Sequence, residues 1–108
     1  MKANYVQRGE ALDYKNTTKD MIAAGDVMVL GKRIGVAGTD MIPGGLGTVH
    51  VDGVYEFDKK DKTAMTVGTE VYLAEDGITV TAENNVLAGF VAADATAESE
   101  TVWVKINA

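Results

Sequence analysis

Gly47–Phe57 reads GTVHVDGVYEF, and its apolar residues recur at every second position. The odd-numbered residues from Val49 to Phe57 would share one face of a strand, and the even-numbered residues from Thr48 to Glu56 would share the other. A period of two is typical of a β-strand with one buried face. We therefore expect one strand across this stretch, in a protein built from β-sheet.

Short alternating runs of the same kind occur along the rest of the chain, separated by turn residues such as Pro43-Gly44-Gly45 and Glu75-Asp76-Gly77. We expect strands at Glu10–Tyr14, Val27–Leu30, Arg33–Ala37, Glu70–Ala74, Ile78–Thr81, Leu87–Ala92 and Thr101–Ile106. Only Thr17–Ala24 has helix signals, namely threonine N-cap residues and a glycine just past its end. At about two turns it is marginal as a helix, and an irregular loop is an equal alternative.

A weak internal repeat divides the chain into two halves. Gly25-x-Val27-x-Val29 resembles Gly68-x-x-Val71-x-Leu73, and Ile34-Gly35-Val36-Ala37 resembles Ala88-Gly89-Phe90-Val91-Ala92. Each half then contains a Thr-Val-x-Val segment, beginning at Thr48 or Thr101. Short alternating strands also produce such similarities by chance. A true repeat would be two related β-modules, each covering the apolar face of the other.

The length of 108 residues suits one domain, so the predicted fold is a single all-β domain over residues 1–108. We expect a small β-barrel or sandwich with at most one short helix. Residues 1–8 precede the first expected strand as a possible N-terminal arm, which would either dock on a neighbouring sheet edge or fray. The candidate contact residues in this arm are Tyr5 and Val6.

Composition excludes several classes of function. The chain has no cysteine, which removes disulfides, thiolate metal sites and a cysteine nucleophile. Its formal net charge of −6 disfavours binding to nucleic acid. The first residues do not form a signal peptide, and the longest apolar run, Val86–Ala93, is too short to span a membrane.

No pattern of catalytic residues is visible. The only histidine, His50, lies on the polar face of the expected strand. A phosphate-binding loop would need a glycine at Asp26 and a serine or threonine at Arg33 around the Gly31-Lys32 pair. We therefore expect neither an enzyme nor a protein that holds a metal or cofactor.

The remaining signal is large apolar side chains on outer faces. If Val102, Val104 and Ile106 face the core, alternation places Trp103, the sole tryptophan, outside. The same argument places Met28 and Leu30 opposite Val27 and Val29, and it places Tyr72 opposite Val71 and Leu73. These four outer residues are candidates for a partner surface. Burial of both strand faces in a two-layer fold, or isolated surface aromatics, is the alternative explanation.

The ordered set of motifs resembles the phage capsid cement (head decoration) family, and the similarity covers essentially the whole chain. The matching segments are Asn4-Tyr5-Val6-Gln7-x-Gly9, Gly25-Asp26-Val27-x-Val29, Ile34-Gly35-Val36-Ala37, Ile42-x-x-Gly45-x-Gly47-Thr48-Val49, Gly53-Val54-Tyr55-Glu56-Phe57, Gly68-x-x-Val71-Tyr72 and Val102-Trp103-Val104-Lys105-Ile106. Many members are described as RecA/RadA-type recombinases, a description that the missing phosphate loop contradicts.

The resemblance implies a structural virion protein that binds the outer surface of a phage head and clamps neighbouring major capsid subunits. It also implies self-association, with a trimer favoured, and synthesis in the cytoplasm of the bacterial host. Two alternatives stay open: a tail or baseplate module, and a small-ligand or glycan-binding module in which Trp103 or Tyr72 stacks on a ring.

Overall fold

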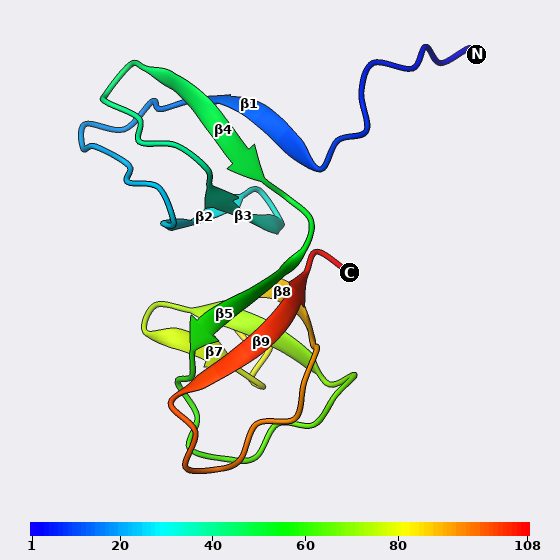
Figure 1. Ribbon diagram of the computed structural model, residues 1–108, viewed down its shortest axis with the longest axis vertical. Coiled ribbons are helices and arrows are strands. Elements are labelled where there is room, and N and C mark those ends of the chain that lie inside the picture. The colour runs from blue at the N-terminus through cyan, green and yellow to red at the C-terminus, as the bar shows by residue number, and fades with distance from the viewer.

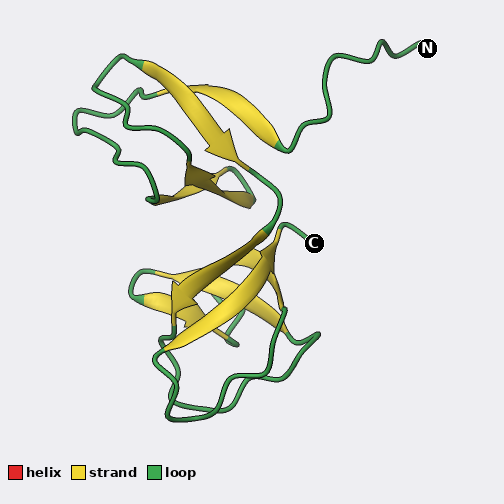
Figure 2. Ribbon diagram, viewed as in Figure 1, coloured by secondary structure: helices red, strands yellow, loops and turns green.

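A computed structural model describes all residues 1–108, and it contains nine strands and no helix (Figures 1 and 2). The predicted all-β class is confirmed. No helix in the structure is long and apolar enough to cross a membrane. The strands are β1 (Ala11–Lys15), β2 (Val27–Leu30), β3 (Arg33–Ala37), β4 (Leu46–His50), β5 (Val54–Asp58), β6 (Glu70–Ala74), β7 (Gly77–Thr79), β8 (Val86–Val91) and β9 (Thr101–Ile106).

The strands form two antiparallel sheets. The first has the order β1-β4-β3-β2, and the second has the order β5-β9-β8-β6-β7. Figure 1 shows the two sheets as two lobes, which we call the N-terminal lobe (β1 to β4) and the C-terminal lobe (β5 to β9). The chain passes once between them, from β4 into β5. This arrangement agrees with the predicted sandwich of two β-modules.

The expected single strand at Gly47–Phe57 is wrong, because the chain changes sheets within it. β4 ends at His50 and β5 begins at Val54, and Gly53 between them has a φ of +119°. Such a φ is readily adopted only by glycine. Val49 is buried in the N-terminal lobe and Phe57 in the C-terminal lobe, so the even spacing of apolar residues continues across two separate strands.

Thr17–Ala24 is an irregular loop, and the short helix considered from the sequence is absent. The buried side chain of Asn16 organises this loop. Its Nδ2 donates hydrogen bonds to the carbonyl oxygens of Asp20 (2.8 Å) and Met41 (3.0 Å), while its Oδ1 accepts from the backbone N–H and hydroxyl of Thr18. These bonds satisfy backbone groups that a helix would pair with each other.

The sequence repeat is confirmed as a structural repeat. Strands β1, β2, β3 and β4 correspond to β5, β6, β8 and β9, since the pairing order is the same in both sheets. The isolated bridge Ile22↔Met41 of the first half has its equivalent in Met65↔Ala95. β7 has no counterpart in the N-terminal lobe, because Gly31-Lys32 connects β2 directly to β3.

The ladders correct the alignment of the two halves. Gly35 of β3 and Gly89 of β8 are equivalent positions in the two sheets. Met28 pairs with Gly35 and Val71 pairs with Gly89, so Met28 is the equivalent of Val71. In the same way, the pairs Ala37↔Val49 and Val91↔Val104 make Val49 the equivalent of Val104. The sequence comparison matched valine to valine and was therefore shifted by one residue in β2 and by two in β4.

The larger hydrophobic cluster joins both lobes. It contains eleven buried residues, and Ile34 and Val36 of β3 belong to it together with residues of the second sheet. The other face of β3, with Ala37, packs in a smaller cluster with Met41 and Val49. β3 is thus buried on both faces, and it is the strand that holds the lobes together.

Asn107 makes a second connection between the lobes. Its Nδ2 donates to the carbonyl oxygens of Ile34 (2.7 Å) and Val51 (2.9 Å), and its Oδ1 accepts from the N–H of Ile34 (3.1 Å). Its own backbone N–H donates to the carbonyl oxygen of Ala88 (2.8 Å). One residue after β9 therefore bonds to backbone groups of both sheets.

Candidate interaction surface

Trp103 lies on the outer face of the second sheet, as the alternation predicted. Val102, Val104 and Ile106 are buried, whereas Trp103 is 53% exposed. Its register partner on β5 is Glu56, and the indole Nε1–H donates a hydrogen bond to Glu56 Oε2 (3.2 Å). This bond satisfies the only polar group of the indole and leaves the ring exposed to a partner.

An ion pair lies beside Trp103. Lys105 Nζ bonds to Asp52 Oδ1, and both side chains are partly exposed. The hydrogen bond from Lys105, a backbone hydrogen bond from Gly53 and the positive charge of Lys105 together lower the pKa of Asp52. The carboxylate of Asp52 is therefore ionised at neutral pH. In an exposed position the ion pair contributes little to stability.

Two further apolar residues belong to this face. Val54 and Phe90 are the register partners of Lys105 on either side of β9, so they lie on the same face as Trp103. Val54 is exposed and Phe90 is half-buried. We call Val54, Glu56, Phe90, Trp103 and Lys105 the Trp103 face. Phe90 was not among the residues predicted from the sequence. Because side chains alternate along a strand, a buried Val91 places Phe90 on the outer face.

Tyr72 lies on the same side of the second sheet. Val71 before it is buried and Leu73 after it packs against the larger cluster, so the tyrosine points outward as predicted. It is half-buried, and the register of the β6–β8 pairing shifts by one residue between Val71 and Tyr72. Three neighbouring strands, β6, β8 and β9, thus present Tyr72, Phe90 and Trp103 on one outer face.

Met28 and Leu30 do not lie on an outer face, which corrects the prediction. Both pack against the small cluster of the N-terminal lobe, whereas Val27 and Val29 are 41% and 53% exposed. Met28 pairs with Gly35, whose missing side chain leaves room on that face for Val49 and Leu30. Because all four residues of β2 are apolar, alternation alone could not tell the inner face from the outer one.

Tyr5 and Val6 are separate from the Trp103 face. They lie in the segment before β1 and are 82% and 86% exposed. No residue of the segment 1–9 makes a backbone hydrogen bond, and its one ion pair is the exposed Arg8–Glu10 contact. Figure 1 shows this segment extending away from both lobes. We call residues 1–9 the arm.

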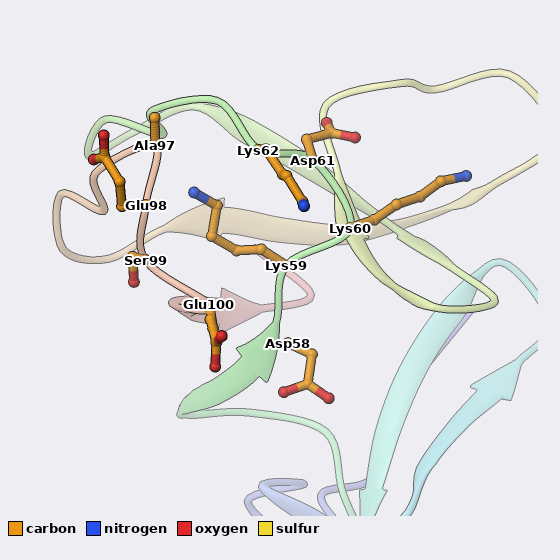
Figure 3. A pocket seen from close by; sticks show the side chains of 9 residues that line it. All are labelled: Asp58, Lys59, Lys60, Asp61, Lys62, Ala97, Glu98, Ser99 and Glu100. Atoms are coloured by element: carbon orange, nitrogen blue, oxygen red, sulfur yellow. The ribbon is translucent and has the colours of Figure 1, made fainter.

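A charged hollow lies at the end of the C-terminal lobe (Figure 3). It is formed by the loop 58–62 and the segment 97–100, and Lys60 points away from that segment. Lys59 Nζ donates to the carbonyl oxygens of Thr63 and Thr96 (both 2.8 Å), and Asp61 accepts from Thr79 and Val80. These two charged groups hold loops in place, which explains their presence without a ligand.

No other side-chain constellation indicates chemistry. No three His, Cys, Asp or Glu side chains lie close enough together to hold a metal ion. His50 lines a groove between the two sheets together with Val36, Tyr55 and Phe57. Exposed apolar side chains also occur elsewhere, for example Leu46 and Ile42 in the N-terminal lobe. Among the exposed features, the aromatic sheet face and the extended arm suit contacts with other proteins.

The model of a family described as phage cement protein matches residues 6–106. No curated protein and no solved structure matches the chain.

Proposed function

The chain belongs to the phage cement protein family, whose members are structural proteins associated with the phage capsid, and we propose that it binds the outer surface of the head and clamps neighbouring major capsid subunits. On this proposal the protein is a component of the virion, synthesised in the cytoplasm of the bacterial host. It acts by binding and not as an enzyme. Residues 1–108 act as one domain, which the cluster shared between the two lobes supports.

The observation that carries the proposal is the Trp103 face. The exposed Trp103 lies beside the partly exposed Phe90, Tyr72 lies on the same side of the sheet, and the charged groups of Lys105 and Asp52 flank them. Tryptophan and tyrosine in such positions are frequent anchors of protein interfaces, and a rim of charged groups is typical around them. We assign this face to the contact with the major capsid protein.

The proposed mechanism is multivalent binding. Each copy would touch more than one capsid subunit, and self-association, with a trimer favoured, would add further contacts through effective concentration. Binding only to the assembled head stabilises that state by mass action. The net charge of −6 disfavours nucleic acid as a partner, and no membrane contact is proposed.

We expect purified protein to co-sediment saturably with undecorated heads of the matching phage. Trp103→Ala should bind roughly 10- to 100-fold more weakly, since removing an anchor of this kind costs about 2 kcal/mol. Ile42→Ala is the matched control, because Ile42 is also exposed and apolar but lies in the N-terminal lobe. It should bind like the unchanged protein.

Equal binding by Trp103→Ala and the unchanged protein would move the capsid contact to another surface. Binding to tails but not to heads would replace the proposal by a tail or baseplate module. A response of Trp103 fluorescence to glycans, without binding to heads, would favour the ligand-binding alternative.

A further inference from the structure

The structural repeat exposes a strand position that is filled in one lobe and empty in the other. In the C-terminal lobe, β7 pairs with the outer edge of β6, through Tyr72↔Thr79 and Leu73↔Ile78. Ile78 is fully buried, and it also bridges to Lys59 just after β5. In the N-terminal lobe the sheet ends at β2, the equivalent of β6, and no strand covers its outer edge.

The backbone of β2 is ready to accept a further strand. The N–H of Ala37 on β3 donates to the carbonyl oxygen of Asp26, just before β2. Hydrogen-bonded and non-hydrogen-bonded pairs alternate along an antiparallel ladder, so the next bonded pair is Met28 with Gly35. The N–H and C=O groups of Val27 and Val29 therefore point away from β3. No hydrogen bond outside the strand ladders involves these groups. An open edge of this kind is a template for an added strand.

The arm has the properties that such a strand needs. Its backbone is unbonded and extends away from its own lobes (Figure 1). Nine extended residues cover up to about 30 Å, more than the 22 Å thickness of the molecule. The arm can therefore reach a neighbouring copy.

Charge also favours this pairing. The arm contains Lys2 and Arg8 and no acid, so it carries two of the ten basic residues. The remaining residues hold eight basic and sixteen acidic side chains, a net charge of −8 against +2 for the arm. Val27 shares a hollow with Asp58, Glu75 and Asp76. Asp76 pairs with Lys60 (3.8 Å), so acidic groups outnumber basic ones at the Val27 end of the β2 edge.

We propose that the arm of a second copy of this chain binds the free edge of β2 as an additional antiparallel or parallel strand. Because side chains of a strand alternate, either Tyr5 or Val6 would point inward as Ile78 does in the C-terminal lobe. The contact is heterologous, so copies linked in this way form a closed ring when the rotation between them allows it. The inference deepens the proposed self-association and rests on it, and it does not depend on head binding.

The test compares the full chain with a variant lacking residues 2–8, by sedimentation equilibrium and by amide hydrogen exchange. The full chain should self-associate, and the amides of Val27 and Val29 should exchange at least 10-fold more slowly in the oligomer. The shortened variant should keep its fold, since the arm makes no backbone bond, but it should be monomeric with fast exchange at both amides.

Two substitutions at one exposed position provide a matched pair. Val29→Lys places a positive charge against the basic arm and should weaken self-association roughly 10-fold. Val29→Glu changes the same site by a similar volume with the opposite charge, and it should associate at least as tightly as the unchanged chain.

The contrary results distinguish a failure of the arm-binding inference from a failure of the proposed self-association. Self-association that survives removal of residues 2–8 overturns the arm as the occupant and leaves self-association standing. A full chain that is monomeric at every concentration overturns both. Slow exchange of Val27 and Val29 that occurs only on heads assigns the edge to a capsid segment, and it also overturns the inference.

Discussion

Replacing Gly89 by alanine should destabilise the fold severely, lowering the free energy of unfolding by more than about 4 kcal/mol. Gly89 lies in β8 with a φ of +148°, and a Cβ atom there would overlap the carbonyl oxygen of Lys105. β8 cannot move away, because Gly89 pairs with Ile106 on one side and with Val71 on the other. Urea denaturation followed by circular dichroism measures the loss.

Gly68→Ala is the control that separates collision from backbone strain. Gly68 also has a positive φ, of +90°, but nothing lies within 4 Å of the position where its Cβ would be. Its substitution should cost only the strain, about 1–2 kcal/mol. Equal losses for the two variants would contradict the close approach of β8 and β9 at Gly89.

Asn107→Ala should lower the free energy of unfolding by about 3 kcal/mol. The substitution removes three side-chain hydrogen bonds to the backbone of Ile34 and Val51, each with a net contribution of about 1 kcal/mol. It also places alanine at a φ of +58°, a conformation that asparagine tolerates better. The same denaturation experiment measures this loss.

Asn84→Ala is its control. Asn84 has nearly the same φ, +62°, but it lies in an exposed turn and its side chain makes no hydrogen bond within the protein. The cost there should be about 1 kcal/mol, from the backbone alone. A loss at Asn107 no larger than that at Asn84 would show that the side chain does not hold the lobes together.

The sequence located most strands because alternation is a local signal. Thr101–Ile106 was predicted with its correct bounds and faces, since Val102, Val104 and Ile106 differ clearly from the polar residues beside Trp103. β2 gave the wrong faces because the run Val27–Leu30 is apolar at every position. Which side of such a strand is buried depends on partners that lie elsewhere in the sequence.

Long-range features were harder to predict. The change of sheet at Gly53 was missed because the apolar spacing continues through it without a shift in phase. The role of Asn107 could not be seen at all, since its partners Ile34 and Val51 are 73 and 56 residues away. The repeat was visible in the sequence, but only the strand pairing showed that β2 lacks a counterpart of β7.

The most direct test of the capsid-binding proposal is the temperature at which heads break, measured on undecorated heads with and without saturating amounts of the protein. The proposed clamping predicts a higher breakage temperature for decorated heads, because the protein binds the intact head and not its separated subunits. An identical breakage temperature, at a protein concentration where binding is complete, would contradict the stabilising role.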